Sequence, residues 1–164
     1  MTDTRDGSMT FSYRGARAMI LLQEDELRHF IKTWRLAKAS GVNLPGGDDP
    51  DYASYDALLR HILRAARGYL TWICEQLGLP DPEVEPAPEI DVIDSSCDHY
   101  LAHLLARWRD PLKDVPEERF NRPEYSSRWK VLYCLDAMLE HAVMHPIRHR
   151  FQLEELLGKR SYDE

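Results

Sequence analysis

The stretch WKVLYCLDAMLEHAVMHPIRHRFQLEELLG, residues 129–158, decides the fold and the candidate site of this chain. Its pattern predicts one long helix that carries His141, His145 and His149 at successive spacings of four. A helix turns by about 100° per residue, so each step of four moves a side chain only about 40° around the axis. The three imidazoles therefore share one stripe, and the opposite side of the helix is charged. The other members of the stripe are Val131, Cys134, Leu135, Met138, Ala142, Gln152, Leu153 and Leu156.

Three histidines on one buried helix face call for a chemical explanation. A single His on such a face is usually a packed or hydrogen-bonded core residue. Three in line indicate a metal site or a proton relay, because imidazole is both a common metal ligand and a group that titrates near neutral pH.

Three further helices are predicted upstream, over residues 14–39, over 55–77, and from an N-cap at Asp94 or Ser95 to about residue 109, each with apolar residues at helical spacing. Ser54 is the expected N-cap of the second helix, and Ser126 or Ser127 that of the fourth. The linker PDPEVEPAPE, residues 80–89, is too rich in proline for a helix or a central strand. The sequence thus predicts an all-α four-helix bundle with long loops between helices, as a single domain over residues 1–164 with a loose leader at 1–13.

The composition of the chain excludes several classes of binding partner and indicates a cellular compartment. The formal net charge of −7 argues against nucleic-acid binding, and the arginines at 60, 64 and 67 are interpreted as a solvated helix edge. Three separated cysteines with no CxxC pair form neither a disulfide framework nor a cysteine zinc site. No stretch has the apolar length of a membrane span, and the polar, acidic N-terminus has no apolar segment behind a basic start, so a cytoplasmic protein without a membrane partner is expected.

The remaining histidines differ in the face on which they lie. His99 and His103 form an HxxxH pair, but they are predicted on the solvent side of the third helix, and His29 has no partner at helical spacing. His61 lies in or beside the core stripe of the second helix and can face the imidazoles of the fourth. Three neutral imidazoles suit zinc or nickel, and three protein ligands leave a position open, as in catalytic zinc sites. From periodicity alone, a metal site and packed core histidines both stay open.

The segment LEHAVMHPIRHRFQL, residues 139–153, resembles the fourth-helix signature of the DinB/YfiT-like superfamily. That signature is a first His, then His-x-x-x-His, then Arg and often Gly-Gln. The upstream match is the single His of the second helix, here His61 in LLRHILRAARGYL, and the plan of four helices matches over essentially the whole chain. Pro146 and Phe151 depart from the pattern. The positions that match the signature are, in order, His141, His145, His149, Arg150 and Gln152.

The resemblance implies a metal-binding four-helix bundle that is commonly a homodimer. It implies His61, His145 and His149 as ligands of zinc or nickel. His141 and Gln152 are then expected beside the site, where they orient the ligands.

The resemblance also implies an activity, because characterised relatives include S-transferases and isomerases that use bacillithiol, mycothiol or glutathione. A metal-dependent thiol transferase acting on small electrophiles is therefore expected. The alternatives are a metal-dependent hydrolase, for which Glu24 is a marginal candidate base, and a non-catalytic, stress-associated metal-binding protein. A bundle whose histidines are only core packing is the remaining possibility.

Overall fold

The computed structural model describes residues 10–45, 48–122 and 124–158. Within these ranges there are four α-helices, two short 3₁₀ helices and one two-stranded antiparallel sheet. The prediction of a helical bundle is confirmed at this level, and the sheet is an addition to it. The elements are α1 (Arg14–Ser40), η1 (Pro50–Tyr52), α2 (Tyr55–Leu77), α3 (Ile93–Trp108), η2 (Glu117–Arg119), β1 (Tyr125–Ser126), β2 (Leu132–Tyr133) and α4 (Leu135–Leu156).

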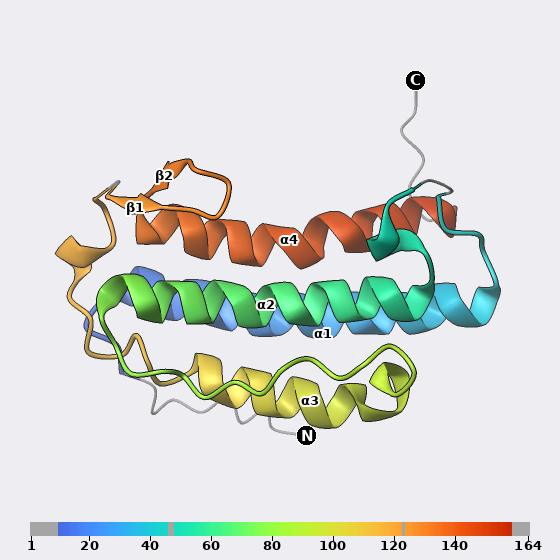
Figure 1. Ribbon diagram of the computed structural model, residues 1–164, viewed down its shortest axis with the longest axis horizontal. Helices are drawn as coiled ribbons and strands as arrows, with labels where there is room; N and C mark the ends of the chain where they lie inside the picture. The colour runs from blue at the N-terminus through green and yellow to red at the C-terminus, as the bar shows by residue number, and fades with distance from the viewer. Residues whose placement is uncertain (1–9, 46–47, 123, 159–164) are drawn as a thin grey trace.

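The helices lie roughly parallel or antiparallel to one another, with α1 and α2 between α4 on one side and α3 on the other (Figure 1). α2 returns antiparallel to α1, and α3 runs in the same direction as α2 (Figure 1). The Ser54 hydroxyl accepts a hydrogen bond from the Ala57 N–H at 3.0 Å and caps α2 as predicted. Gly41 and Gly78 end α1 and α2 with φ of 67° and 66°, a conformation that costs glycine little.

Because α2 and α3 are parallel, the chain between them must cross back along the whole bundle (Figure 1). The linker does so as extended chain without helix or strand, as predicted, and it buries Val84 and Ala87. Side chains of α2 and α3 form hydrogen bonds with the backbone of this linker. The interpretation of residues 60 and 67 as a solvated edge, and of residue 103 as solvent-facing, was therefore wrong. The bonds are Arg60 Nε to Pro88 O (2.9 Å), Arg67 Nε to Val84 O (2.8 Å), Tyr100 Oη to Glu85 O (2.9 Å) and Glu85 N to His103 Nε2 (3.1 Å).

The fourth helix begins six residues later than predicted, at Leu135 instead of residue 129. Its N-cap is Cys134, whose Sγ accepts from the Ala137 N–H at 3.4 Å, so neither Ser126 nor Ser127 caps it. Those earlier residues form the β1–β2 hairpin, in which Ser127 bonds to Val131 through both its backbone and its hydroxyl. The turn places Val131 in solvent, off the buried stripe.

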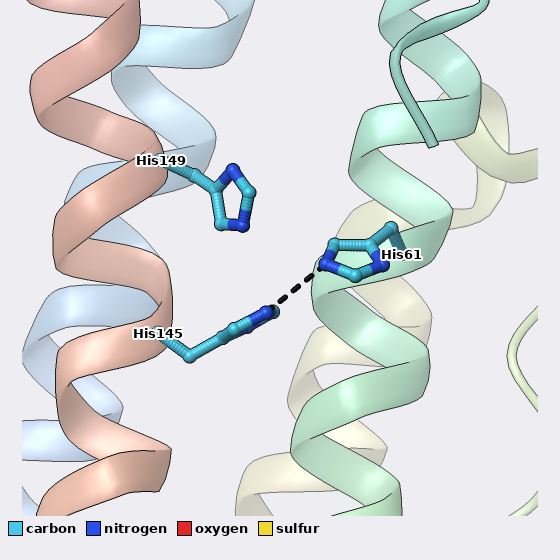
Figure 2. Close-up of side chains that lie close together, drawn as sticks. All are labelled: His61, His145 and His149. Carbon is cyan, nitrogen blue, oxygen red and sulfur yellow. Dashed lines mark hydrogen bonds between the residues drawn. The ribbon is translucent and has the colours of Figure 1, made fainter. Parts of the chain in front are cut away.

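α4 continues through Pro146, which is itself buried. A proline has no N–H, so the Ala142 carbonyl loses its usual partner one turn further along. The helix nevertheless keeps His145 and His149 on the same side, facing α2 (Figure 2).

Residues 1–9 of the predicted leader lie outside the described residues. Phe11 and Tyr13 pack against the core, and the Tyr13 hydroxyl donates to Asp136 Oδ2 at 2.8 Å. Across the described ranges, no helix combines the length and apolarity needed to cross a bilayer.

Gln23 is a polar side chain in the apolar stripe of α1. It is 1% exposed, and both its amide atoms lack a hydrogen-bond partner among the described residues. An unpaired buried amide costs about 1–3 kcal/mol. Gln23→Met keeps a similar shape without that penalty, so we expect it to raise the free energy of unfolding by about 1–2 kcal/mol, measured by urea denaturation with an unchanged m-value. A drop in stability would show that the amide is bonded in solution.

Candidate metal centre

Three imidazoles converge between α2 and α4. His61 projects from α2, and His145 and His149 project towards it from successive turns of α4 (Figure 2). The His61 and His145 Nε2 atoms are 3.0 Å apart, and one potential ligand atom from each ring lies within 4.8 Å of the others. The ring centroids form a nearly equilateral triangle with sides of 4.8, 4.9 and 5.2 Å. The structure therefore brings together the three histidines that the resemblance implied.

Burial keeps these imidazoles in their neutral form. His145 and His149 are 7% and 9% exposed, while His61 is half-buried. Burial lowers the pKa of His145 to about 3 and that of His149 to about 4, and the neighbouring imidazoles and Arg148 act in the same direction. Burial also lowers the pKa of His61, against the opposing effect of Asp51. Neutral imidazole is the form that binds a metal ion.

The hydrogen bonds of His149 fix which of its nitrogens can bind a metal. Its Nδ1 is 2.8 Å from the Tyr52 hydroxyl, and that hydroxyl donates to Gln152 Oε1 at 2.6 Å. Since the hydroxyl has one proton and gives it to Gln152, His149 Nδ1 must be the donor to Tyr52. The lone pair is then on Nε2, which points into the cluster (Figure 2).

His61 has an acidic neighbour on the side away from the cluster. Asp51 Oδ2 lies 2.7 Å from His61 Nδ1, but the ring N–H does not point at it within hydrogen-bond geometry, so the contact is electrostatic. A carboxylate at this distance favours a proton on Nδ1 and so leaves the lone pair on Nε2. His61 Nε2 is the atom that faces His145.

Asp51 and Tyr52, both from η1, contact the histidine cluster, and the sequence did not reveal them as candidates. They belong to the loop between α1 and α2, where Asp49 caps the short helix by accepting from the Asp51 N–H at 3.0 Å. The only signal in the sequence is an acidic residue and a tyrosine directly before a histidine-bearing helix. Gln152, which was expected beside the site, lies on α4 and reaches it through Tyr52.

His141 is separated from the other three by its aromatic surroundings. Its ring packs against Tyr69, Trp129 and Tyr133 at centroid distances of 5.5, 5.3 and 6.2 Å. It does not belong to the group of close ligand atoms. The stripe of three histidines on α4 thus divides into two residues that face His61 and one that packs among aromatic rings.

A cleft of about 370 Å³ opens beside the cluster. His61 and His145 form one side of it, so the cluster is reachable by a small molecule. Among the described residues, no Asp or Glu lines this cleft, and Glu24 is bound instead by Arg28 and Arg109 at 3.0 and 2.9 Å. The other lining residues are Arg64, Ala65, Gly68, Tyr69, Trp72, Arg128, Trp129 and Met138.

The three histidines lie close enough together to hold a metal ion. An ion bound by imidazole at about 2.0–2.1 Å in tetrahedral geometry needs nitrogens about 3.3 Å apart, so the widest separation has to shrink by at most about 1.5 Å, within the reach of side-chain rotation. His29 and His99 are exposed, away from any such group among the described residues.

Comparison with protein-family models, with curated proteins and with solved structures finds no match to this chain.

Proposed function

We propose that this chain is a DinB/YfiT-like metal-binding protein whose three-histidine site serves the transfer of a low-molecular-weight thiol to a small electrophile. The observation that carries the proposal is that three imidazoles from facing helices lie close together and that two of them also line a cleft. Three ligands beside an open space are typical of catalytic sites, whereas a structural site is closed by a fourth ligand.

The donor set favours zinc or nickel. All three candidate ligand atoms are imidazole nitrogens, which suit these ions, and the group includes no carboxylate oxygen of the kind that magnesium or calcium requires. The hydrogen bond of His149 Nδ1 to Tyr52 supports a metal site as such, because metal-bound histidines usually give their second N–H to an oxygen, and Asp51 lies 2.7 Å from the corresponding nitrogen of His61.

A divalent cation at this site would supply Lewis acidity, which lowers the pKa of a thiol that enters the open side. In the transfer, the sulfur forms a bond to an electrophilic carbon, the leaving group departs with its electron pair, and the thiol proton passes to solvent. The chain's own part is to hold the imidazoles neutral and to shelter the reactants in the cleft.

Hydrolysis is less well supported by the same site. A hydrolase of this kind needs a general base near the attacking water. The described residues that line the cleft include no carboxylate, Asp51 contacts His61 on the side away from the cluster, and Glu24 is held by two arginines.

The resemblance also predicts that the chain forms a homodimer, and this stays a prediction.

The proposal predicts metal-dependent consumption of a thiol. Protein stripped with a chelator and reloaded with zinc or nickel should consume glutathione, mycothiol or bacillithiol in the presence of an electrophile panel, measured by loss of free thiol. His149→Ala should remove the activity, because the site then has only two ligands. His99→Ala is the matched control, since that exposed histidine lies outside the cluster.

Turnover that is equal with and without metal would contradict the proposal. So would the absence of turnover with all three thiols in protein shown to hold one metal ion per chain. In the second case, a non-catalytic metal-binding protein would be the function that fits.

A further inference from the structure

The cleft beside the histidines has a charge opposite to that of the protein as a whole. The chain has a formal net charge of −7, yet the charged residues lining the cleft are two arginines, Arg64 and Arg128. Arg64 is 3.7 Å from Asp51, at the edge of ion-pair distance. Arg128 has no carboxylate partner anywhere in the described part of the chain. The Arg128 guanidinium is therefore available to bind an anion in the cleft, although the protein as a whole has more acidic than basic residues.

The backbone makes room for this guanidinium. Gly68 lies in the interior of α2, where glycine costs about 1 kcal/mol relative to alanine. The Arg128 side chain sits over it, with its terminal nitrogens 3.7 and 3.8 Å from where a Cβ of residue 68 would be. A larger side chain here would occupy the space between α2 and the hairpin turn that carries Arg128.

The rest of the cleft is suited to an apolar body. Trp72, Trp129 and Met138 contribute to its walls, and the Trp72 indole N–H donates to Ser126 O at 3.4 Å, which ties β1 to α2. The hydroxyl of Tyr69, another lining residue, makes no hydrogen bond to the described residues and could donate to a ligand. Apolar walls with a few convergent polar groups are the usual composition of a small-molecule site.

We infer that the cleft binds a small organic acid, with its carboxylate at Arg128 and its apolar body against Trp72 and Trp129. A planar guanidinium can bind a carboxylate through two parallel hydrogen bonds. His61 and His145 line the same cleft, so the opposite end of the molecule reaches the histidine cluster. The statement that the bound acid is one of the two reactants rests on the proposed function. The carboxylate can belong to the thiol or to the electrophile.

Three probes of one shape test the charge requirement: 3-phenylpropionate, 3-phenylpropanol and 3-phenylpropylamine. Their binding to the full chain is measured by calorimetry, with metal-stripped and with zinc-loaded protein. We expect the carboxylate to bind at least about tenfold more tightly than the alcohol, the amine to bind weakest, and the carboxylate's advantage to fall as salt is added.

Two variants test the residues. Arg128→Gln should reduce the affinity for the carboxylate about tenfold and leave that for the alcohol unchanged, because only a charge-assisted bond is lost. Gly68→Leu should abolish binding of both by filling the cleft. Arg122→Gln is the matched control, since that exposed arginine belongs to the same loop but pairs with Glu124 at 3.8 Å.

A second pair of probes identifies the source of the carboxylate. If zinc strengthens binding of 3-mercaptopropionate more than that of 3-phenylpropionate, the acid is the thiol; equal effects assign it to the electrophile. Equal affinities for the three phenylpropyl probes, or an Arg128→Gln protein that binds the carboxylate as well as wild type, would overturn the inference. Carboxylate binding that depends on Arg128 in protein that takes up no metal would support it while removing the proposed function.

Discussion

Replacing His145 with alanine is expected to abolish metal binding and the stabilisation that goes with it. In the wild-type protein, zinc or nickel at about 100 times its dissociation constant should add about 2.7 kcal/mol to the free energy of unfolding. For a chain of 164 residues this corresponds to roughly 5–10 °C in Tm. The ring centroid of His145 lies within 5 Å of those of both other histidines, so the variant should show no shift and no bound metal.

The measurement pairs elemental analysis of untagged protein with thermal melts at increasing metal concentration. His145→Phe keeps the volume of the buried ring without a ligand atom, and it should behave as His145→Ala does. His103→Ala, a half-buried histidine that is no part of the cluster, should keep the full metal-dependent shift. Equal metal content and equal shifts in wild type and both His145 variants would show that His145 does not bind the metal and would contradict the site.

The second large effect is expected from Asp51, which no pattern in the sequence marked. Asp51→Asn removes the charge beside His61 Nδ1, and we expect metal affinity to fall about 10–100-fold, the usual cost of losing a residue that orients a ligand. Tyr52→Phe should have a smaller effect of the same kind, because it frees His149 Nδ1 from its fixed partner. Competition titration against a chelator of known affinity measures both.

Asp98→Asn is the control for the loss of an acidic surface residue. Asp98 pairs with Arg35 at 2.8 Å between α1 and α3 and is no part of the cluster of His61, His145 and His149, so its replacement should leave metal affinity unchanged. The aspartate assignment fails if Asp51→Asn binds metal as tightly as wild type while remaining folded by circular dichroism.

Helical periodicity was sufficient to predict the number of helices and the inward faces of His61, His145 and His149, although not the start of α4 or the surroundings of His103. It placed the starts of α1 and α2 at residues 14 and 55, where the structure has them. It also placed His61 opposite the imidazoles of α4, because a stripe that must be buried in a bundle has to face another helix. The set of three histidines followed from the resemblance, and the distances agree with it.

Features that depend on contacts between distant segments were not predictable in this way. Cys134 is an unusual N-cap, so nothing in the sequence marked the true start of α4 or the hairpin before it. The roles of Asp51 and Tyr52 depend on where the loop between α1 and α2 settles against α4. Likewise, Arg60 and Arg67 have the spacing of a solvated helix edge, and only the path of the linker shows that they bind its carbonyl groups.

The separation of the histidines along the chain has a consequence for biosynthesis. His61 and His145 are 84 residues apart in sequence, and α3 with the whole linker lies between them. His61 therefore leaves the ribosome long before His145 and His149 are synthesised, and a nascent chain with three helices has only one imidazole of the cluster. A metal ion held by all three imidazoles would therefore bind only after α4 has been synthesised and has docked against α2.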